Sequence, residues 1–486
     1  MKSQLSKWED TTIHIRRICA IIFVLYAALV TAFYYLAGDQ LRFRDSRGNF
    51  RMPEAETGTL ELTAGTVIEQ RFSVPIQRLE AVSVQWGAYY RANSGTITML
   101  LLRGDNGEEL ARHSFDAADV AEGTVLALSP EQPLETIYDV PLLLRLSSDS
   151  APGSAATPLM AAEEPEDSNF VLRLNGTEAS GVLCFSAEGT DYIWTGLHYW
   201  KFAAAMGVVL AALLLSVWKR YRSGKRSYVV NALVALKKYR FLIRQLVARD
   251  FKLKYKRSVL GVLWSFLNPL LMMLVQYFVF STLFKSDIPN FAVYLLIGVV
   301  MFNFFSEACG MSLTSILGNA SLITKVYMPK YIYPLTRTAS SAINLLISLL
   351  PLIVVCALTG VRLQRATFLA LFFLFCLVVF CFGLGLLLST MMVFFRDTQF
   401  LWNVISMMWM YATPIFYPES ILPENIASLL PFNPLYLLLK STRSCILDGV
   451  SPEPVRYMQC LLVALGTLLL GAAVFYRNQN KFVLYL

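Results

Sequence analysis

Long apolar runs alternate with charged segments along this chain, and they predict membrane-spanning helices. A helix of about 20 apolar residues crosses a hydrocarbon core of about 30 Å, because it rises about 1.5 Å per residue. Such runs predict about eight spans, at 18–36, 199–218, 259–284, 291–315, 339–360, 366–392, 399–417 and 456–476. The last six follow one another through short connections.

Between the first two spans the pattern changes to short runs in which apolar and polar residues alternate, as in half-buried strands. Strands are predicted near 58–63, 67–74, 79–89, 95–103, 108–115, 124–129, 139–147, 169–175 and 181–187. Asp105-Asn106-Gly107 predicts a hairpin turn between two of them. These strands predict an antiparallel β-sandwich over residues 38–198. The stretch 150–168, rich in Ser, Ala, Pro and Glu, is expected to be a mobile loop.

The composition favours a membrane protein over a soluble one. A soluble chain of 486 residues would be expected to form about three domains. The 56% of apolar residues, the 13% of aromatic residues and the positive mean hydropathy instead indicate a polytopic membrane protein. The eight cysteines include no CxxC pair and the three histidines are not clustered, so neither a disulfide framework nor a metal site is predicted.

Charge is distributed unevenly, and its distribution predicts the topology. Residues 38–200 hold 24 acidic residues against 11 arginines and no lysine. Fourteen basic residues lie between Lys219 and Arg257, opposed there only by Asp250. Because Lys- and Arg-rich segments stay in the cytoplasm, we expect 219–258 to be cytoplasmic and 38–198 to be extracytoplasmic. Residues 1–37 are expected to form a cytoplasmic N-terminus and a retained first span, and the C-terminus is then cytoplasmic as well.

The segment from Leu236 to Phe284 runs from a cationic amphipathic helix directly into a span. Its apolar residues form one helical stripe and its basic residues fall on the other side. The stripe comprises Leu236, Tyr239, Leu242, Ile243, Leu246, Val247 and Leu253, and the basic side comprises Lys237, Lys238, Arg240, Arg244, Arg249 and Lys252. Such a helix is expected to lie in the headgroup plane with its cations toward lipid phosphates. Asp250 projects into the apolar sector, and a pair with Lys254, its nearest helical partner, is expected to fix the helix.

This segment and the residues after it resemble a known family of transporters. The motif consists of Arg249, Asp250, Phe251, Lys252, Tyr255, Lys256, Ser258, Leu260, Gly261, Trp264 and Pro269. It resembles the signature of ABC type-2 permeases that export polysaccharides, the O-antigen, teichoic-acid and capsule exporters, and the likeness extends from about Val234 to the C-terminus. We therefore predict an α-helical polytopic membrane protein with about eight spans, six of them forming an ABC type-2 permease core over 259–486, and an inserted extracytoplasmic antiparallel β-sandwich domain.

The resemblance implies a transporter subunit rather than an enzyme. The implied function is ATP-driven export of a lipid-linked polysaccharide, an undecaprenyl-pyrophosphate glycan, across the bacterial cytoplasmic membrane. The implied partners are a second copy of the chain, two copies of a separate ABC ATPase, the lipid-linked polysaccharide and membrane lipids, and no nucleic acid is expected. No GxxxxGK[ST] motif occurs in the chain, so ATP and Mg²⁺ are expected on the ATPase subunit and no cofactor on this one.

The resemblance also assigns roles to particular residues. The implied interface and lipid-pyrophosphate residues are Arg249, Asp250, Lys252, Lys254, Lys256 and Arg257. The stretch 316–338 resembles the coupling helix that docks on the ATPase, and a plain connecting loop is the alternative. Its candidate coupling residues are Asn319, Leu322, Ile323, Lys325, Tyr327 and Pro329. The proline-rich region 414–454 resembles the re-entrant helices at the channel exit.

Aromatic residues suggest two places where a sugar could stack. Candidates for a channel lining are Tyr277, Phe302, Phe305, Trp402, Trp409 and Tyr411; the alternative for each is packing or contact with lipid. In the sandwich, a possible sugar site comprises Trp86, Tyr89, Tyr90 and Arg91. There the alternative is that neighbouring residues alternate between the core and the surface of one strand. For the whole domain, the alternatives are a cap over the exit and a platform for a partner protein.

The sequence is also compatible with other interpretations of Glu307 and of the function. Glu307, an acid within a span, is expected either at the cytoplasmic end of its helix or paired with a basic residue of another helix. An ABC type-2 exporter of lipids or drugs is one alternative function. Another is a membrane glycosyltransferase or polymerase, which should show a carboxylate pair near an outer loop, whereas Asp116 and Asp119 lie in the soluble domain. A membrane anchor for a binding module would leave six further spans without a purpose.

Overall fold

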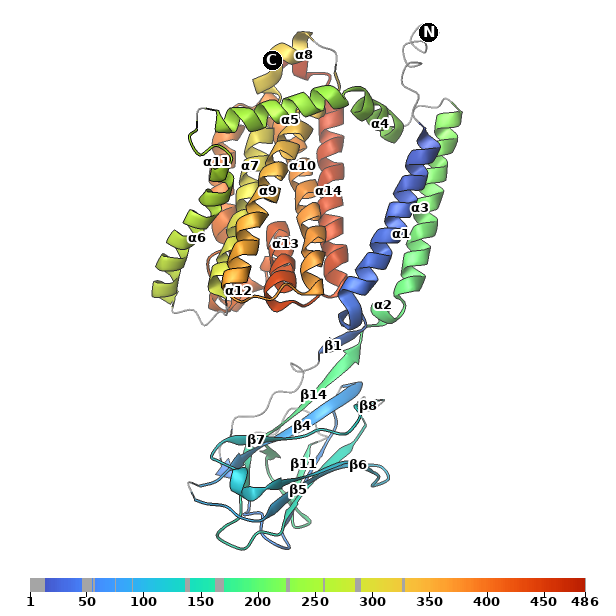
Figure 1. The fold of residues 1–486 in the computed structure, drawn as a ribbon. Helices are drawn as coiled ribbons and strands as arrows, with labels where there is room; N and C mark the ends of the chain where they lie inside the picture. Colours follow the sequence, from blue (N-terminus) through green and yellow to red (C-terminus); the bar gives the residue numbers. More distant parts are fainter. Residues whose placement is uncertain are drawn as a thin grey trace. The chain divides into compact units, whose positions relative to one another are not determined.

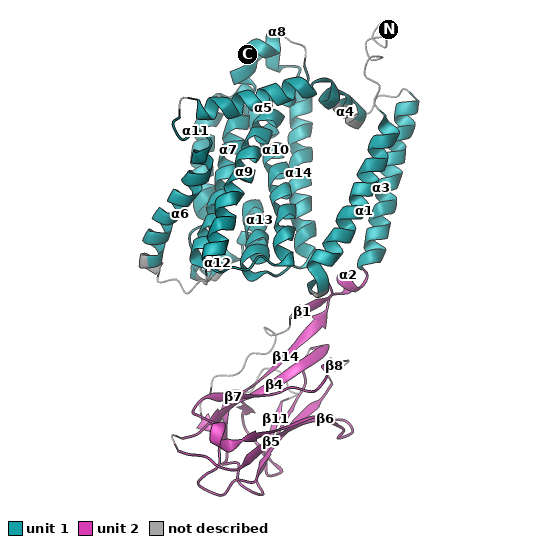
Figure 2. Ribbon diagram, in the orientation of Figure 1, with its two compact units in different colours: residues 1–40, 199–486 teal, residues 41–198 magenta. Residues whose placement is uncertain are grey.

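The computed structural model describes residues 14–45, 55, 57–74, 76–89, 91–135, 140–161, 170–223, 228–256, 258–284, 290–325 and 328–485. The chain divides into two compact units, shown in different colours in Figure 2. Unit 1 comprises Met1–Gln40 and Tyr199–Leu486 and contains the long apolar helices. Unit 2, Leu41–His198, contains the strands and is inserted between two of those helices.

Unit 2 is built from two antiparallel sheets. One sheet has the order β12 (Thr177–Ala179), β11 (Val171–Leu174), β3 (Val67–Phe72), β9 (Leu142–Ser148), β5 (Thr96–Arg103) and β6 (Glu109–Asp116). The other has the order β1 (Phe43–Asp45), β14 (Phe185–Tyr192), β4 (Arg78–Gly87), β10 (Thr157–Ala161) and β13 (Val182–Leu183). In it, β2 (Thr57–Gly58) pairs with β10, and β7 (Thr124–Leu128) and β8 (Leu134–Glu135) pair with β4. The alternating apolar residues of both sheets meet in one core that includes Phe72, Trp86 and Phe185.

The sheets confirm most of the strand pattern and correct one part of it. The turn at Asp105-Asn106-Gly107 joins the paired strands β5 and β6, and Gly107 has the positive φ of 70° that such a turn requires. The stretch 150–168 is wrong as a mobile loop, because β10 lies within it and pairs with β2, β4 and β13. The strand is only five residues long, and this is too short for its pattern to be recognised among the small residues around it. Residues 162–169 lie outside the described part of the chain.

Unit 1 contains, among the described residues, seven helices long and apolar enough to cross a membrane. They are α1 (Ile15–Ala37), α3 (Tyr199–Arg222), α6 (Leu263–Phe284), α7 (Phe291–Leu313), α9 (Ile332–Leu358), α10 (Ala370–Phe394) and α14 (Pro454–Asn478). The eighth predicted span, 399–417, is only the 15-residue helix α11 (Thr398–Ala412). It rises about 22 Å at 1.5 Å per residue, less than a hydrocarbon core. The helix ends there because Pro414 disfavours helical backbone at the residue before it.

Shorter helices complete both units. They are α2 (Trp194–Leu197) in unit 2, and α4 (Tyr228–Lys238), α5 (Arg240–Tyr255), α8 (Ala320–Lys325), α12 (Glu424–Ala427), α13 (Pro434–Arg443) and α15 (Phe482–Tyr485) in unit 1. Figure 1 shows that α5 runs across the ends of the spanning helices rather than along them. The single amphipathic helix expected from the sequence is divided into α4 and α5 at Tyr239.

Helices α10 and α14 touch at their backbones, and two glycines permit this contact. A Cβ added to Gly471 would overlap the carbonyl oxygen of Gly383, and one added to Gly383 would overlap the backbone of Leu468. Small residues at a crossing let membrane helices approach closely, and this approach supplies much of the attraction between them. The two helices can therefore cross this closely only because Gly383 and Gly471 have no Cβ atom.

Gly471→Ala is expected to destabilise unit 1 by about 1–3 kcal/mol, the usual cost of overpacking. Gly466→Ala on the same helix is the matched control, since a Cβ there meets nothing within 4 Å. It should be neutral or slightly stabilising, because alanine favours helices over glycine. The measurement is thermal denaturation of the two detergent-purified variants beside the unsubstituted protein. Equal melting of the two variants would contradict the close crossing.

Candidate functional site: the interface helix and its anchors

Helix α5 rests on an apolar cluster made by segments far apart in the sequence. Leu246 is buried against residues from the helices α9, α10, α14 and α15, and Leu242 and Ile243 pack beside it. These three residues belong to the predicted apolar stripe. Leu253 of that stripe is instead 58% exposed. The apolar stripe predicted from the sequence therefore matches the buried face of α5, but it extends one turn too far toward the C-terminal end of the helix.

Asp250 is the buried acid of this helix, and its partners differ from the prediction. Its side chain is 1% exposed, and its Oδ1 lies 3.1 Å from Arg249 Nη2 and 3.2 Å from Arg337 Nη1 on α9. The expected Asp250–Lys254 pair is wrong. Because Asp250 points into the apolar sector, it faces α9 and meets Arg337 there, whereas Lys254 reaches a different acid.

Arg249 extends this contact to the segment before α8. Its Nη2 donates to Asn319 Oδ1 at 3.1 Å, and Asn319 Nδ2 donates to the carbonyl of Ser315 at 2.8 Å. Asn319 is buried and ends η4 (Leu317–Asn319), the turn that leads into α8. We call Arg249, Asp250, Asn319 and Arg337 the Arg249 cluster. It joins α5 to η4 through a charged hydrogen bond and to α9 through an ion pair, so the three elements are linked.

A second polar group holds the C-terminal end of α5. Lys254 Nζ lies 2.8 Å from Glu307 Oε2 on α7, and Glu307 Oε1 accepts from Asn344 Nδ2 of α9 at 2.6 Å. The Tyr255 hydroxyl contacts Ser265 of α6 and donates to Asn344 Oδ1 at 3.1 Å. We call these five residues the Glu307 cluster. Of the two alternatives for Glu307, the structure shows the pair with a basic residue of another helix.

A double-mutant cycle of Lys254→Met and Glu307→Gln is expected to give a coupling of about 1 kcal/mol or less, because solvent screens a partly exposed pair. The cycle uses thermal denaturation of the purified protein to measure stability. A control cycle of Lys252→Met with Glu307→Gln should give no coupling, since Lys252 is exposed on the same helix and forms none of the ion pairs of the described residues. Equal coupling in the two cycles would contradict the observed pair.

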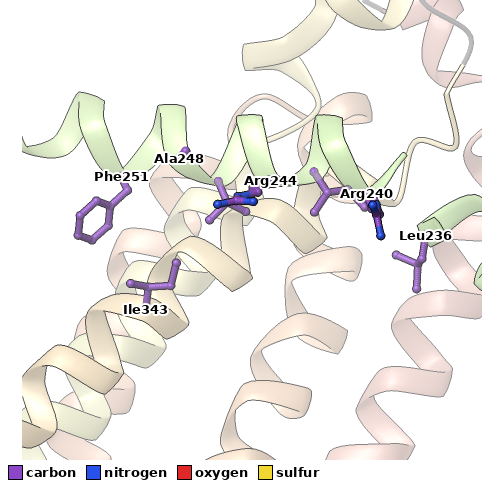
Figure 3. Close-up of a pocket in the computed structure, with 8 residues that line it drawn as sticks. Leu236, Arg240, Arg244, Ala248, Phe251 and Ile343 are labelled. Carbon is purple, nitrogen blue, oxygen red and sulfur yellow. The ribbon is translucent and has the colours of Figure 1, made fainter. Parts of the chain in front are cut away.

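An apolar groove runs beside α5, with two arginines along it (Figure 3). Its volume is about 520 Å³. It is lined by Leu236, Arg240, Ile243, Arg244, Val247, Ala248, Phe251 and Ile343. The sequence pattern placed Arg240 and Arg244 on the basic side of the helix, but it gave no sign of a groove. The arrangement offers apolar walls beside guanidinium groups, a combination that suits an amphiphile with an anionic headgroup.

The predicted lipid-pyrophosphate residues fall into three groups. Arg249 and Lys254 are held in the two clusters, each by an acid. Lys252 and Lys256 are exposed. Arg257 lies outside the described residues. The cations therefore divide between anchoring the helix and facing its surroundings.

The predicted coupling residues lie around α8. Asn319 is in the Arg249 cluster, and Leu322 and Ile323 pack on the same apolar cluster as α5. Lys325 is exposed and Pro329 is half-buried, whereas Tyr327 lies outside the described residues. Because α5 shares a hydrophobic cluster with α8 and a hydrogen bond with η4, the turn that leads into α8, displacement of α8 is expected to strain α5.

The predicted channel aromatics differ in their exposure. Phe305 is fully buried among Phe302, Phe380, Trp402 and Trp409. Phe305 and Trp402 therefore pack inside one chain. For these two residues the alternative of packing is the one observed. Two further candidates keep exposed rings, namely Tyr277 and Tyr411.

The predicted sugar site of unit 2 is only partly at the surface. Trp86 is fully buried in the sandwich core and presents no ring to solvent, because its position in β4 alternates inward. Tyr89 is exposed, and Arg91 forms an ion pair with Glu61. Tyr90 lies outside the described residues. The prediction that Trp86 belongs to a surface sugar site is therefore wrong.

A buried arginine near the predicted exit region was missed by the sequence reasoning. Arg443, the last residue of α13, donates to the carbonyls of Pro414, Ile415 and Tyr294 at 2.6, 2.8 and 3.2 Å. Its guanidinium also lies 3.4 Å from the centroid of the Tyr294 ring. Lys440 and Arg443 both lie in the last turn of α13, so charge alone did not show that Arg443 is the buried one. The residue fixes the segment after α11 against α7 and α13.

Comparison with known proteins gives consistent relatives for this half of the chain. Residues 242–447 match the family model described as ABC-2 type transporter. An O-antigen export system permease protein RfbA of Klebsiella pneumoniae is 30% identical over 237 residues, which are 48% of this chain and 90% of that protein. One of Myxococcus xanthus is 30% identical over 252 residues, 51% of this chain and 96% of that protein. The polysialic acid transport protein KpsM of Escherichia coli is 24% identical over 249 residues, 50% of this chain and 95% of that protein.

Proposed function

This chain belongs to the ABC type-2 permeases of the polysaccharide-export group, and on that premise we propose that it moves a lipid-linked polysaccharide outward in an ATP-driven exporter. The observation that carries the proposal is the polar link between the interface helix α5 and the segment leading into α8. The Arg249–Asn319 hydrogen bond and the Asp250–Arg337 pair form this link. This link joins α5, whose cations can bind a lipid headgroup, to the segment leading into α8, which is proposed to contact the ATPase.

The groove beside α5 supports an amphiphilic substrate. Its apolar lining can hold a lipid chain, and Arg240 and Arg244 can hold a pyrophosphate through charged hydrogen bonds. Lys252 on α5 and Lys256, directly after its last residue, add positive charge. An undecaprenyl-pyrophosphate glycan combines these two properties. Export of a lipid or drug stays the second candidate, because the same groove would accept an anionic lipid without a glycan.

The ATPase is proposed as a separate subunit that docks on α8 and carries ATP and Mg²⁺. Leu322 and Ile323 seat α8 on the apolar cluster, while Ser321, Thr324 and Lys325 are exposed for contact. Movement of α8 on nucleotide binding would pass through Asn319 and Arg249 to α5. Two chains of this protein and two ATPase subunits are proposed to form the complete exporter.

Charge supports the proposed orientation in the bacterial cytoplasmic membrane. The 14 basic residues between Lys219 and Arg257 favour a cytoplasmic location for α4 and α5. Both termini are then cytoplasmic, and the acidic unit 2 is extracytoplasmic. The glycan would leave between the two chains near the exposed aromatic residues Tyr277 and Tyr411.

Deletion of this gene in its own strain tests the proposal. Surface polysaccharide is expected to disappear while the lipid-linked glycan, unchanged in length, accumulates on the cytoplasmic side. Reintroducing the chain should restore surface polysaccharide only with an ATPase whose Walker lysine is intact. Unchanged surface polysaccharide in the deletion strain would contradict the proposal. Shortened glycan chains would instead indicate the polymerase alternative.

A further inference from the structure

The turn after β4 in unit 2 holds an exposed aromatic side chain on an unusual backbone. Tyr89 has a φ of 50°, and its side chain is 53% exposed. A non-glycine residue in the left-handed region is strained, and it persists only where its surroundings fix it. Strain of this kind is often found where a side chain must be presented in a particular direction.

Two carboxylates fix this turn from either side. Glu122 Oε2 accepts hydrogen bonds from the backbone N–H groups of Ala88 and Tyr89, at 2.9 and 2.7 Å. On the other side Arg91 pairs with Glu61 and donates to the carbonyl of Ala155 at 2.8 Å. The backbone conformation of Tyr89 is therefore determined by charged contacts rather than by burial of its ring.

Glu61 is itself positioned and kept ionised. Its Oε2 accepts from the backbone N–H of Gly153 at 3.1 Å. That hydrogen bond, with a further contribution from Arg91, lowers the pKa of the Glu61 carboxyl below its ordinary value. A carboxylate has about four lone-pair sites, so Glu61 and Glu122 can also accept hydrogen bonds from a ligand's hydroxyl groups.

The ring of Tyr89 lies over the backbone of β2 instead of entering the core. A Cβ added to Gly58 would overlap the Tyr89 hydroxyl, so glycine leaves the space that the phenol occupies. The neighbouring aromatic Trp86 belongs to the core cluster, whereas Tyr89 does not. The Arg91 guanidinium lies over the ring, 6.0 Å from its centroid, and the exposed part of the ring leaves an aromatic surface open beside the two carboxylates.

Buried polar groups without partners lie in the same part of unit 2. Asn93 is only 6% exposed, and neither its Oδ1 nor its Nδ2 has a hydrogen-bond partner. Thr157 Oγ1, in the strand paired opposite Gly87, is also buried without one. Such groups are normally satisfied by water or by a ligand. Asn93 follows the turn in the sequence and Thr157 pairs opposite Gly87, so polar as well as aromatic side chains border the turn.

We propose that Tyr89, Glu61, Arg91 and Glu122 form a binding site for the exported polysaccharide, which stacks a sugar ring on Tyr89. This inference rests on the proposed function for the identity of its ligand. The charge of the domain further limits the ligand, since residues 38–200 hold 24 acidic residues against 11 arginines. A polyanionic glycan would be repelled. The site therefore takes an uncharged polysaccharide or one that carries amino sugars.

The test uses the full chain in detergent without any ATPase, and the probe is the delipidated surface polysaccharide of its own strain. Tyr89→Ala is expected to weaken binding about tenfold, and Tyr89→Phe to retain it, since stacking needs the ring and not the hydroxyl. Gly58→Ala should weaken binding by displacing the ring while leaving the core intact. Val125→Ala, another exposed apolar position in unit 2, is the control and should bind normally.

Three results would overturn the site. They are equal binding by Tyr89→Ala and the unsubstituted chain, tighter binding of polysialic acid than of the strain's own polysaccharide, and no binding at all. If lipid-linked glycan still stimulates the ATPase in any of these cases, the proposed export function stands without this site. Tyr89-dependent binding in a chain that recruits no ATPase would support the site and contradict the export function.

Discussion

Asp250→Asn is expected to destabilise the exporter and to abolish its glycan-stimulated ATPase activity. The substitution removes the negative charge that pairs with Arg249 and Arg337, whose guanidinium nitrogens lie 3.1 and 3.2 Å from Oδ1. Removing one partner of a buried ion pair costs about 3–5 kcal/mol. The partial exposure of Arg249 and the oxygen retained by asparagine place this variant at the lower end, near about 3 kcal/mol. Thermal denaturation and ATPase assays of the reconstituted complex measure the two effects.

Two further variants identify the partner of Asp250. Arg337→Met combined with Asp250→Asn should recover part of the lost stability, because the double variant no longer leaves the Arg337 charge unpaired. Asp397→Asn, at an exposed acid before α11, is the control and should behave like the unsubstituted chain. If Lys254→Met reproduced the full effect of Asp250→Asn, the assignment of Arg337 as the partner would be wrong.

Arg443→Met is expected to cost about 3–5 kcal/mol, and the protein should be recovered in low yield. The reason is that methionine fills similar space but leaves the Ile415 carbonyl without the donor it has in Arg443, and the Pro414 carbonyl with only a 3.4 Å hydrogen bond from the Tyr294 hydroxyl. Arg443→Lys should rescue only part of the loss, since a single ammonium cannot reach all three carbonyls and also lie flat on the Tyr294 ring. Thermal denaturation and yield of folded protein are the measurements.

Arg477→Met is the control for this experiment, because Arg477 is an exposed arginine near the end of α14. It should change stability by less than about 0.5 kcal/mol, as most surface substitutions do. A comparable loss in both variants would mean that Arg443 does not hold the segment after α11 in place.

Local sequence patterns correctly predicted those elements that are determined by residues close together in the chain. The Asp105-Asn106-Gly107 turn identified the β5–β6 hairpin, because a two-strand turn is determined by its own residues. Amphipathic periodicity identified the buried face of α5 around Leu246, because the helix repeat alone decides which residues share a face. Apolar length identified the seven spanning helices in the same way.

Contacts between distant segments could not be predicted in this way. A helical wheel offers only partners on the same helix, so it proposed Lys254 for Asp250 and could not show Arg337 on α9. The partners of Arg443 are backbone carbonyls, and these carry no signature in the sequence. Strand β10 depends on its neighbours β2, β4 and β13 rather than on its own short pattern. These three features require the tertiary structure.

Polysaccharide export is best tested by the ATPase activity of this chain and its ATPase in proteoliposomes, with and without undecaprenyl-pyrophosphate glycans. We expect stimulation by the glycan of the chain's own strain, and loss of that stimulation in Asp250→Asn. A stable complex that responds to lipids but to no glycan would contradict polysaccharide export. Failure of the chain to bind any ATPase would contradict the transporter assignment itself.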